Sequence, residues 1–113
     1  MMIEKIILDY LSSELSVPVY LERPEQPEKE YVLLEKTGSS VRNHIYSATL
    51  ALQSIAPTLY GAASLNELVK AAMDKAVKLD EITHSKLNSD YNYTNPTSKT
   101  YRYQAVYDVV FYD

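Results

Sequence analysis

The residues best suited to metal binding are two histidines, His44 and His84, which stand far apart in the sequence. Each falls in a segment predicted to be a strand, and neither has a second histidine at ligand spacing. A zinc site built from histidine and carboxylates needs at least three convergent ligands, and no such cluster is present. We therefore expect strand histidines on the surface, with no metal and no cofactor.

Carboxylates offer a second kind of chemistry, because a glycosidase places two carboxyl groups on either side of a cleft. The acidic residues that stand closest together are Glu22, Glu25, Glu28 and Glu30. Pro24 and Pro27 interrupt this segment, which is typical of an exposed loop. A solvated loop has nothing to bury a carboxyl group or to separate two pKa values, so we expect no catalytic pair there.

Nucleophilic and phosphate-binding motifs are also missing. The chain has no cysteine, and its serines lack the G-x-S-x-G context of a nucleophile elbow. Phosphate-binding loops need several glycines, whereas this chain has only Gly38 and Gly61, far apart. The sequence therefore predicts a protein that is not an enzyme and takes no small-molecule substrate.

The closing stretch "YNYTNPTSKTYRYQAVYDVVFYD" holds six of the eleven tyrosines and suggests base stacking instead. It lacks both glycines of the RNA-recognition strand pattern, and Asp108 places a negative charge among the rings. The formal net charge of −4 also argues against a nucleic-acid partner, since phosphate neutralisation supplies most of such affinity. A small nucleic-acid-binding module thus remains an alternative that the residues do not favour.

Length and composition indicate the number of domains and the class of protein. A chain of 113 residues with 46% hydrophobic and 23% charged residues is expected to form a single domain, residues 1–113. The absence of cysteine fits a reducing compartment. Acidic residues inside the apolar run "MMIEKIILDYL" argue against a signal peptide. No apolar run approaches the roughly 20 residues of a membrane span, so no membrane partner is expected.

The first half of the chain should form one helix and three strands. Apolar residues at three- and four-residue steps predict a helix over residues 3–15. Alternation over residues 17–22 predicts a short strand, which Pro18 places at an edge. Residues 31–36 indicate a central strand, residues 38–40 a turn, and residues 41–54 a longer strand with one packed face.

A second helix and two more strands complete the pattern. Ser64 and Glu67 stand in capping-box spacing before an apolar helical stripe. Residues 82–94 and 99–112 have strand character and flank the turn-prone "NPTS". The order α-β-β-β-α-β-β predicts an α+β fold, with two amphipathic helices on one face of a mostly antiparallel, roughly five-stranded sheet.

The last two strands should form a long hairpin with its rings on one face. If opposed residue numbers sum to about 194, then Tyr93 opposes Tyr101 and Tyr91 opposes Tyr103, and all four rings share a face. A strand of about 13 residues spans roughly 43 Å, whereas a helix of that length spans roughly 20 Å. We therefore expect an arm beyond the core, with Tyr91, Tyr93, Tyr101 and Tyr103 as candidate interface residues. The alternative is that the tip folds back and packs the tyrosines within the molecule.

The order of the predicted helices and strands is similar to that of a known protein family. A short helix leads into "VPVYLERPEQPEKEYVLLEKTGS", followed by "IYSATLALQSIAPTLYGAASLNELVKAAMDKA" and the closing "RYQAVYDVVFYD". Over nearly the whole chain this resembles the small tail-terminator, or tail-completion, proteins of the head–tail module of long-tailed phages and prophages. The resemblance implies an α/β fold with helices against one sheet face and no catalytic residues.

What the resemblance implies for function is a structural protein of a virion. Such proteins assemble as a hexameric ring on the tail tube, stop its polymerisation and present a surface to the head connector. The partners would be further copies of the chain, tail-tube proteins and head-connector proteins. The location would be the cytoplasm of the bacterial host during assembly, and then the virion. Another component of the same module, a head-closure or tail-tube protein, is the alternative.

Overall fold

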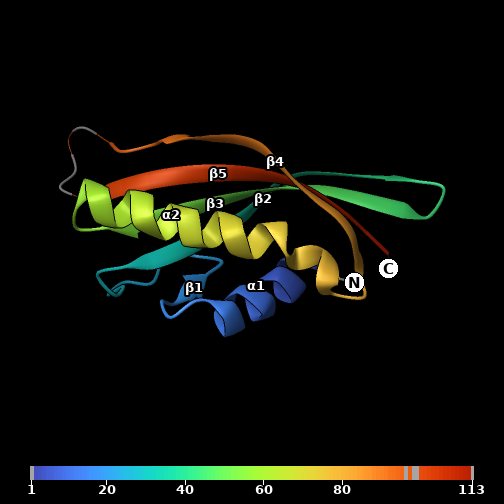
Figure 1. Ribbon diagram of the computed structural model, residues 1–113, viewed down its shortest axis with the longest axis horizontal. Coiled ribbons are helices and arrows are strands. Elements are labelled where there is room, and N and C mark those ends of the chain that lie inside the picture. Colours follow the sequence, from blue (N-terminus) through green and yellow to red (C-terminus); the bar gives the residue numbers. More distant parts are fainter. Residues whose placement is uncertain (1, 96, 98–99, 113) are drawn as a thin grey trace.

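The computed structural model describes residues 2–95, 97 and 100–112 and has one helical layer against one sheet (Figure 1). The helices are α1 (Ile3–Glu14) and α2 (Leu59–Asp74), with a 3-10 turn, η1 (Ala76–Lys78), after α2. The strands are β1 (Val19–Tyr20), β2 (Tyr31–Arg42), β3 (Ile45–Ala56), β4 (Ile82–Asn92) and β5 (Tyr101–Phe111). The predicted α+β class is confirmed.

The strands form a mixed sheet in the order β1-β2-β3-β5-β4. Only the short β1–β2 pair is parallel, and β2–β3, β3–β5 and β4–β5 are antiparallel. Both helices lie on the same side of the sheet (Figure 1). Side chains from this side of β3 and β5, such as Leu50, Leu52 and Tyr107, form the core with the helices. Among the described residues, no helix is long and apolar enough to cross a bilayer.

The helices follow from their apolar stripes, but the start of α2 differs from the prediction. In α1, Ile3, Ile7 and Leu11 are buried against the sheet, and the predicted helix is confirmed except for its last residue. The helix α2 begins before the Ser64–Glu67 pair, so the capping-box prediction is wrong. Its N-cap is Thr58, whose hydroxyl oxygen accepts a hydrogen bond from the backbone N–H of Gly61 at 3.0 Å. The helix therefore starts six residues earlier than a Ser64 cap would place it, at Leu59.

The β2–β3 hairpin is longer than expected, because the predicted turn at residues 38–40 is wrong. The strand β2 runs through this segment to Arg42 and absorbs Thr37 as a bulge opposite β3. The chain reverses at Asn43 and His44, whose φ angles are 52° and 66°. A two-residue hairpin turn with two positive φ angles matches the twist of the flanking strands, and asparagine and histidine tolerate this backbone better than most residues. His44 is therefore a turn residue and not a strand residue.

The β4–β5 hairpin departs from the predicted register at a bulge. Leu87 opposes Tyr107, as the sum of 194 requires, but a shift follows between Leu87 and Ser89. Tyr91 then opposes Gln104, and Asn92 opposes Tyr103. Because side chains alternate along a strand, one inserted residue moves Tyr91 and Tyr93 to the sheet face opposite to that of Tyr103. The predicted single tyrosine face is wrong.

The arm of the molecule is a different hairpin from the one expected. Each residue from Glu35 to Ile45, at the outer part of β2–β3, is exposed, and this part of the hairpin extends past the helices (Figure 1). The β4–β5 hairpin instead ends at the same end of the molecule as the start of α2. Pro96, Ser98 and Lys99 of the expected tip lie outside the described residues.

Candidate interaction surfaces

The four candidate tyrosines lie near the described end of the β4–β5 hairpin, on two faces. Tyr91 and Tyr93 are 41% and 49% exposed, and their rings pack edge to face with centroids 5.9 Å apart. Tyr101 is 36% exposed and Tyr103 is half-buried. Exposed rings with polar hydroxyls are common at protein interfaces, because they bury much area while the hydroxyl keeps a hydrogen bond. The hairpin thus offers aromatic contacts on both faces.

The sheet face away from the helices carries a polar ladder. Gln53 donates to Gln104 at 3.1 Å, and Gln104 donates to the hydroxyl oxygen of Tyr91. Arg102 donates to the side-chain oxygen of Gln53 at 3.3 Å. These bonds link β3, β5 and β4 and hold the Tyr91 ring in place. Arg102 is therefore held within the ladder by its bond to Gln53.

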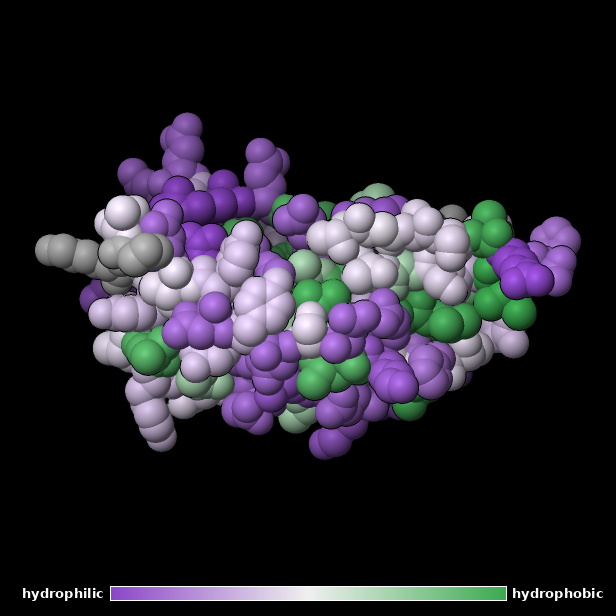
Figure 2. Space-filling model, turned by 90° about the horizontal axis from the view of Figure 1, so that it is seen from above, coloured by the Kyte–Doolittle hydropathy of each residue, from purple (hydrophilic) through white to green (hydrophobic). Residues whose placement is uncertain are grey.

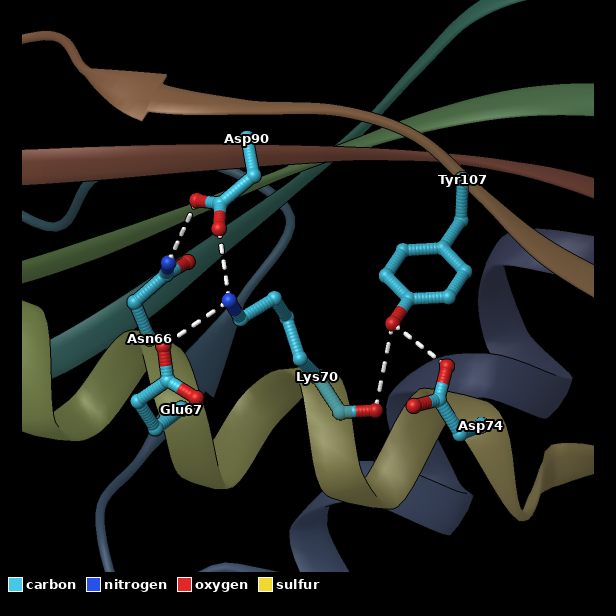
Figure 3. Close-up of polar contacts among 6 residues, drawn as sticks. All are labelled: Asn66, Glu67, Lys70, Asp74, Asp90 and Tyr107. Atoms are coloured by element: carbon cyan, nitrogen blue, oxygen red, sulfur yellow. Dashed lines mark hydrogen bonds and ion pairs between the residues drawn. The ribbon is translucent and has the colours of Figure 1, made fainter.

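A buried polar contact attaches β4 to α2 (Figure 3). Asn66, only 2% exposed, donates to one carboxylate oxygen of Asp90 at 2.7 Å. Lys70 pairs with the other oxygen of Asp90 and also with Glu67, at 2.8 Å. The ion pairs raise the pKa of Lys70, chiefly through the bond to Asp90. This cluster fixes the edge strand on the helix, and a structural role accounts for all its charges.

Tyr107 makes a second attachment between the sheet and α2 (Figure 3). Its ring is fully buried, and its hydroxyl donates to a carboxylate oxygen of Asp74 at 2.7 Å and lies 3.1 Å from the carbonyl oxygen of Lys70. Burial, and then the bond to Asp74, raises the pKa of Tyr107 well above its usual range. The hydroxyl therefore stays protonated in the folded protein.

These two groups predict a loss of stability at alkaline pH. The unfolded chain releases the tyrosine proton near pH ~10 and the lysine proton slightly above it, whereas folded Tyr107 and Lys70 hold theirs to higher pH. The free energy of unfolding should therefore fall as the pH rises above about 10. Urea midpoints at about pH 9 and 11 measure this fall, which Tyr107→Phe should make shallower. An equal fall in both proteins would contradict the assignment to Tyr107.

A groove runs between the end of α1 and the outer side of α2, with a volume of about 580 Å³. Tyr60 and Leu68 on α2 line it and are 84% and 58% exposed. Leu15 and Val17, which follow α1, line its other side, and Glu30 lies at its rim. An apolar floor under exposed large side chains is typical of a protein-binding groove.

The far end of the β2–β3 hairpin is a second apolar surface. Val41 and Ile45, on either side of the turn, are 59% and 47% exposed. Figure 2 shows hydrophobic side chains next to a hydrophilic tip at the end of the molecule that Figure 1 gives to this hairpin. No pattern in the sequence marked these two residues as a pair, because the turn between them was not predicted. The available signal was the short polar run "RNH" between Val41 and Ile45, which could have indicated a turn there.

The remaining candidate residues stay separate in the structure. His44 lies in the turn between β2 and β3, whereas His84 lies on the edge strand β4. The strand β5 separates β4 from β3 in the sheet. Across the described residues, no group of three or more histidines and carboxylates gathers at a distance suited to a metal ion. The acidic segment with Glu22, Glu25 and Glu28 forms an exposed loop between β1 and β2. No catalytic pair is assembled from the predicted candidates.

The chain matches no model of a known protein family, and no curated protein matches its sequence. Its fold defines an α+β protein with one helical layer on a mixed sheet, and apolar and aromatic side chains are exposed at the two ends of the sheet.

Proposed function

We propose that this protein is a non-enzymatic structural component of a phage or prophage virion. It acts as a tail terminator, which caps the tail tube as a homo-oligomeric ring and joins it to the head. The proposal of this family rests on the resemblance between the element order of this chain and that of tail-completion proteins. The structure contributes the surfaces through which such a ring can be built.

The observation that carries the proposal is the pair of unlike contact surfaces at opposite ends of an elongated molecule. The Cα trace measures 45 × 25 × 24 Å. Val41 and Ile45 are exposed at one end, and the tyrosines of the β4–β5 hairpin at the other. When two different patches of one subunit meet, the contact is head to tail, and such contacts close into a ring if the rotation allows it. A terminator needs a closed ring.

The same surfaces also fit a second component of the module. A tail-tube protein uses head-to-tail or stacking contacts as well, but it polymerises without limit, whereas a terminator stops at a fixed number of subunits. The size distribution of the assembled protein therefore separates these two proteins. A nucleic-acid-binding module would instead retard single-stranded DNA in a gel at low salt.

We expect sedimentation of the purified protein to show a discrete closed oligomer whose mass does not grow once assembly is complete. A hexamer would have six times the monomer mass. A mass that rises without limit with concentration would favour the tube protein. A monomer that shifts single-stranded DNA would overturn the structural assignment.

The tyrosine surface has its own test within this assembly. Because Tyr91 and Tyr103 are proposed to contact a neighbouring subunit or tube protein, Tyr91→Ser/Tyr103→Ser should lower the assembled fraction at a given concentration. His84→Ser on β4, outside the tyrosine end, is the matched control. An unchanged size distribution in the tyrosine variant would remove these residues from the interface.

A further inference from the structure

We propose that the end of the β2–β3 hairpin of one copy docks in the α1–α2 groove of a second copy. This inference rests on the proposed ring and assigns the hairpin end to the groove of the next subunit, so the tyrosines of the β4–β5 hairpin make a separate contact. The inserted segment is Val41–Ile45 with its turn, and the receiving groove is lined by Leu15, Val17, Tyr60 and Leu68.

The inserted end is the tip of the β2–β3 hairpin. The two-residue turn at Asn43 and His44 keeps the strands paired up to Arg42 and Ile45. Val41 and Ile45 project from opposite faces of the hairpin, because they belong to adjacent pairs of the register. Because Val41 and Ile45 lie on opposite faces, both can be covered in a groove with two walls, whereas a flat surface would cover only one of them. Little backbone ordering is required on binding, since the hairpin is already formed.

The receiving groove has two apolar walls of the matching kind. Leu68 and Tyr60 stand on α2 at one wall, while Leu15 and Val17 form the other. Leu68 is 58% exposed although it lies on a helix whose neighbouring Leu65 and Val69 are buried. Covering such side chains removes apolar area from water, which stabilises the contact. A docked Val41 and Ile45 would cover both walls.

Charge complementarity favours the same pairing. No carboxylate lies between Lys36 and Tyr60 in the sequence, and Arg42 has no ion-pair partner among the described residues. The rim of the groove carries Glu14 and Glu30. Lys78 pairs with Glu14 at 2.6 Å, and Lys75 is the one lysine in the lining, so Glu30 is the carboxylate left for a cation from outside. Arg42 of the docked hairpin supplies that cation.

The contact must join two molecules rather than fold one molecule on itself. The hairpin end and the amino-terminal part of α2 lie at opposite ends of the long axis (Figure 1). The strands that form the hairpin are paired along their length and continue into the core, so the tip cannot turn back. The groove and the hairpin end are separate surfaces, which give each subunit one donor and one acceptor. This is the heterologous arrangement that a ring requires.

Cysteine cross-linking tests the contact directly, because the natural chain contains no cysteine. We expect Val41→Cys/Leu68→Cys, oxidised mildly at a concentration where the protein assembles, to give a ladder of disulfide-linked species that a reducing agent removes. A disulfide requires Cα atoms within about 7 Å, so the ladder reports close contact. Val41→Cys/Leu87→Cys, which places the second thiol on the exposed edge strand, is the matched control and should give no ladder.

The possible results separate this inference from the proposed function. Discrete closed oligomers without a Val41–Leu68 ladder would overturn the docking geometry and leave the ring. A ladder within open-ended polymers would support the docking and overturn the terminator. A protein that stays monomeric at every concentration and forms no ladder would overturn both.

Charge exchange gives a second measurement: Arg42→Glu should weaken assembly, and adding Glu30→Arg should restore it. Absence of rescue would remove the ion pair from the contact.

Discussion

Replacing Tyr107 with alanine is expected to lower the free energy of unfolding by about 3–5 kcal/mol, as for other large buried aromatic residues. The ring is fully buried where β5 faces α2, so truncation leaves a cavity between the sheet and the helix. The hydroxyl bonds to Asp74 and to the carbonyl of Lys70 are lost together with the ring. Urea unfolding followed by circular dichroism measures the change as a lower midpoint.

Tyr107→Phe separates the ring from its hydroxyl. It keeps the buried ring, and a single hydrogen bond contributes about 0.5–1.5 kcal/mol, so the loss should be well below that of the alanine variant. A loss as large in Tyr107→Phe as in Tyr107→Ala would mean that the hydroxyl contacts, and not the packing of the ring, hold α2 on the sheet. Tyr112→Ala, just after the end of the same strand, is a control with little expected effect, because Tyr112 is 56% exposed.

The helices were the part of the fold most readable from the sequence, because each carries a full apolar stripe. Residues such as Ile3, Ile7 and Leu11 repeat at helical spacing and are all buried. The error at α2 came from two signals that compete, since Ser64 has capping-box spacing but Thr58 caps the helix through Gly61. Propensity rules rank such residues similarly, and packing of Ala62 against the core decides in favour of the longer helix.

The hairpins were less readable, because single residues set turns and register. Gly38 and two serines indicate a turn, yet Gly38 pairs with Thr49 inside the strand. The actual turn uses Asn43 and His44, a pair that ordinary turn rules do not single out. The bulge at Asn88 left no mark in the alternation of polar and apolar residues. One inserted residue was enough to divide the tyrosines between two faces.

The candidate surfaces were therefore readable only in part. Of the four candidate tyrosines, Tyr91, Tyr93 and Tyr101 are exposed and Tyr103 is half-buried, and the sequence did not predict their division between two faces. The groove could not be predicted, since it depends on how the end of α1 packs beside α2, far away in the sequence. Leu68 is an apolar residue between the buried Leu65 and Val69, and only the structure shows that it is exposed at the groove.

Asp90→Ala is expected to lower the free energy of unfolding by about 1–3 kcal/mol, the cost of a buried donor that loses its acceptor. Asn66 is almost fully buried, and Asp90 accepts its hydrogen bond from the edge strand. The change leaves the amide of Asn66 without that acceptor and removes one of two partners of Lys70. Because β4 is at the edge of the sheet, we also expect faster amide hydrogen exchange along it.

The comparison with Glu67→Ala separates the buried bond from the ion pair. Glu67 also pairs with Lys70, but its side chain is 73% exposed, and exposed ion pairs contribute only about 0–1 kcal/mol. If Asp90→Ala and Glu67→Ala lower the free energy of unfolding equally, the ion pairs of Lys70 contribute to stability and the hydrogen bond of the buried Asn66 amide does not. Adding Asn66→Ala to Asp90→Ala provides the second measurement. The double variant should lose less than the sum of the single losses, because the second change removes the donor that the first leaves without its acceptor.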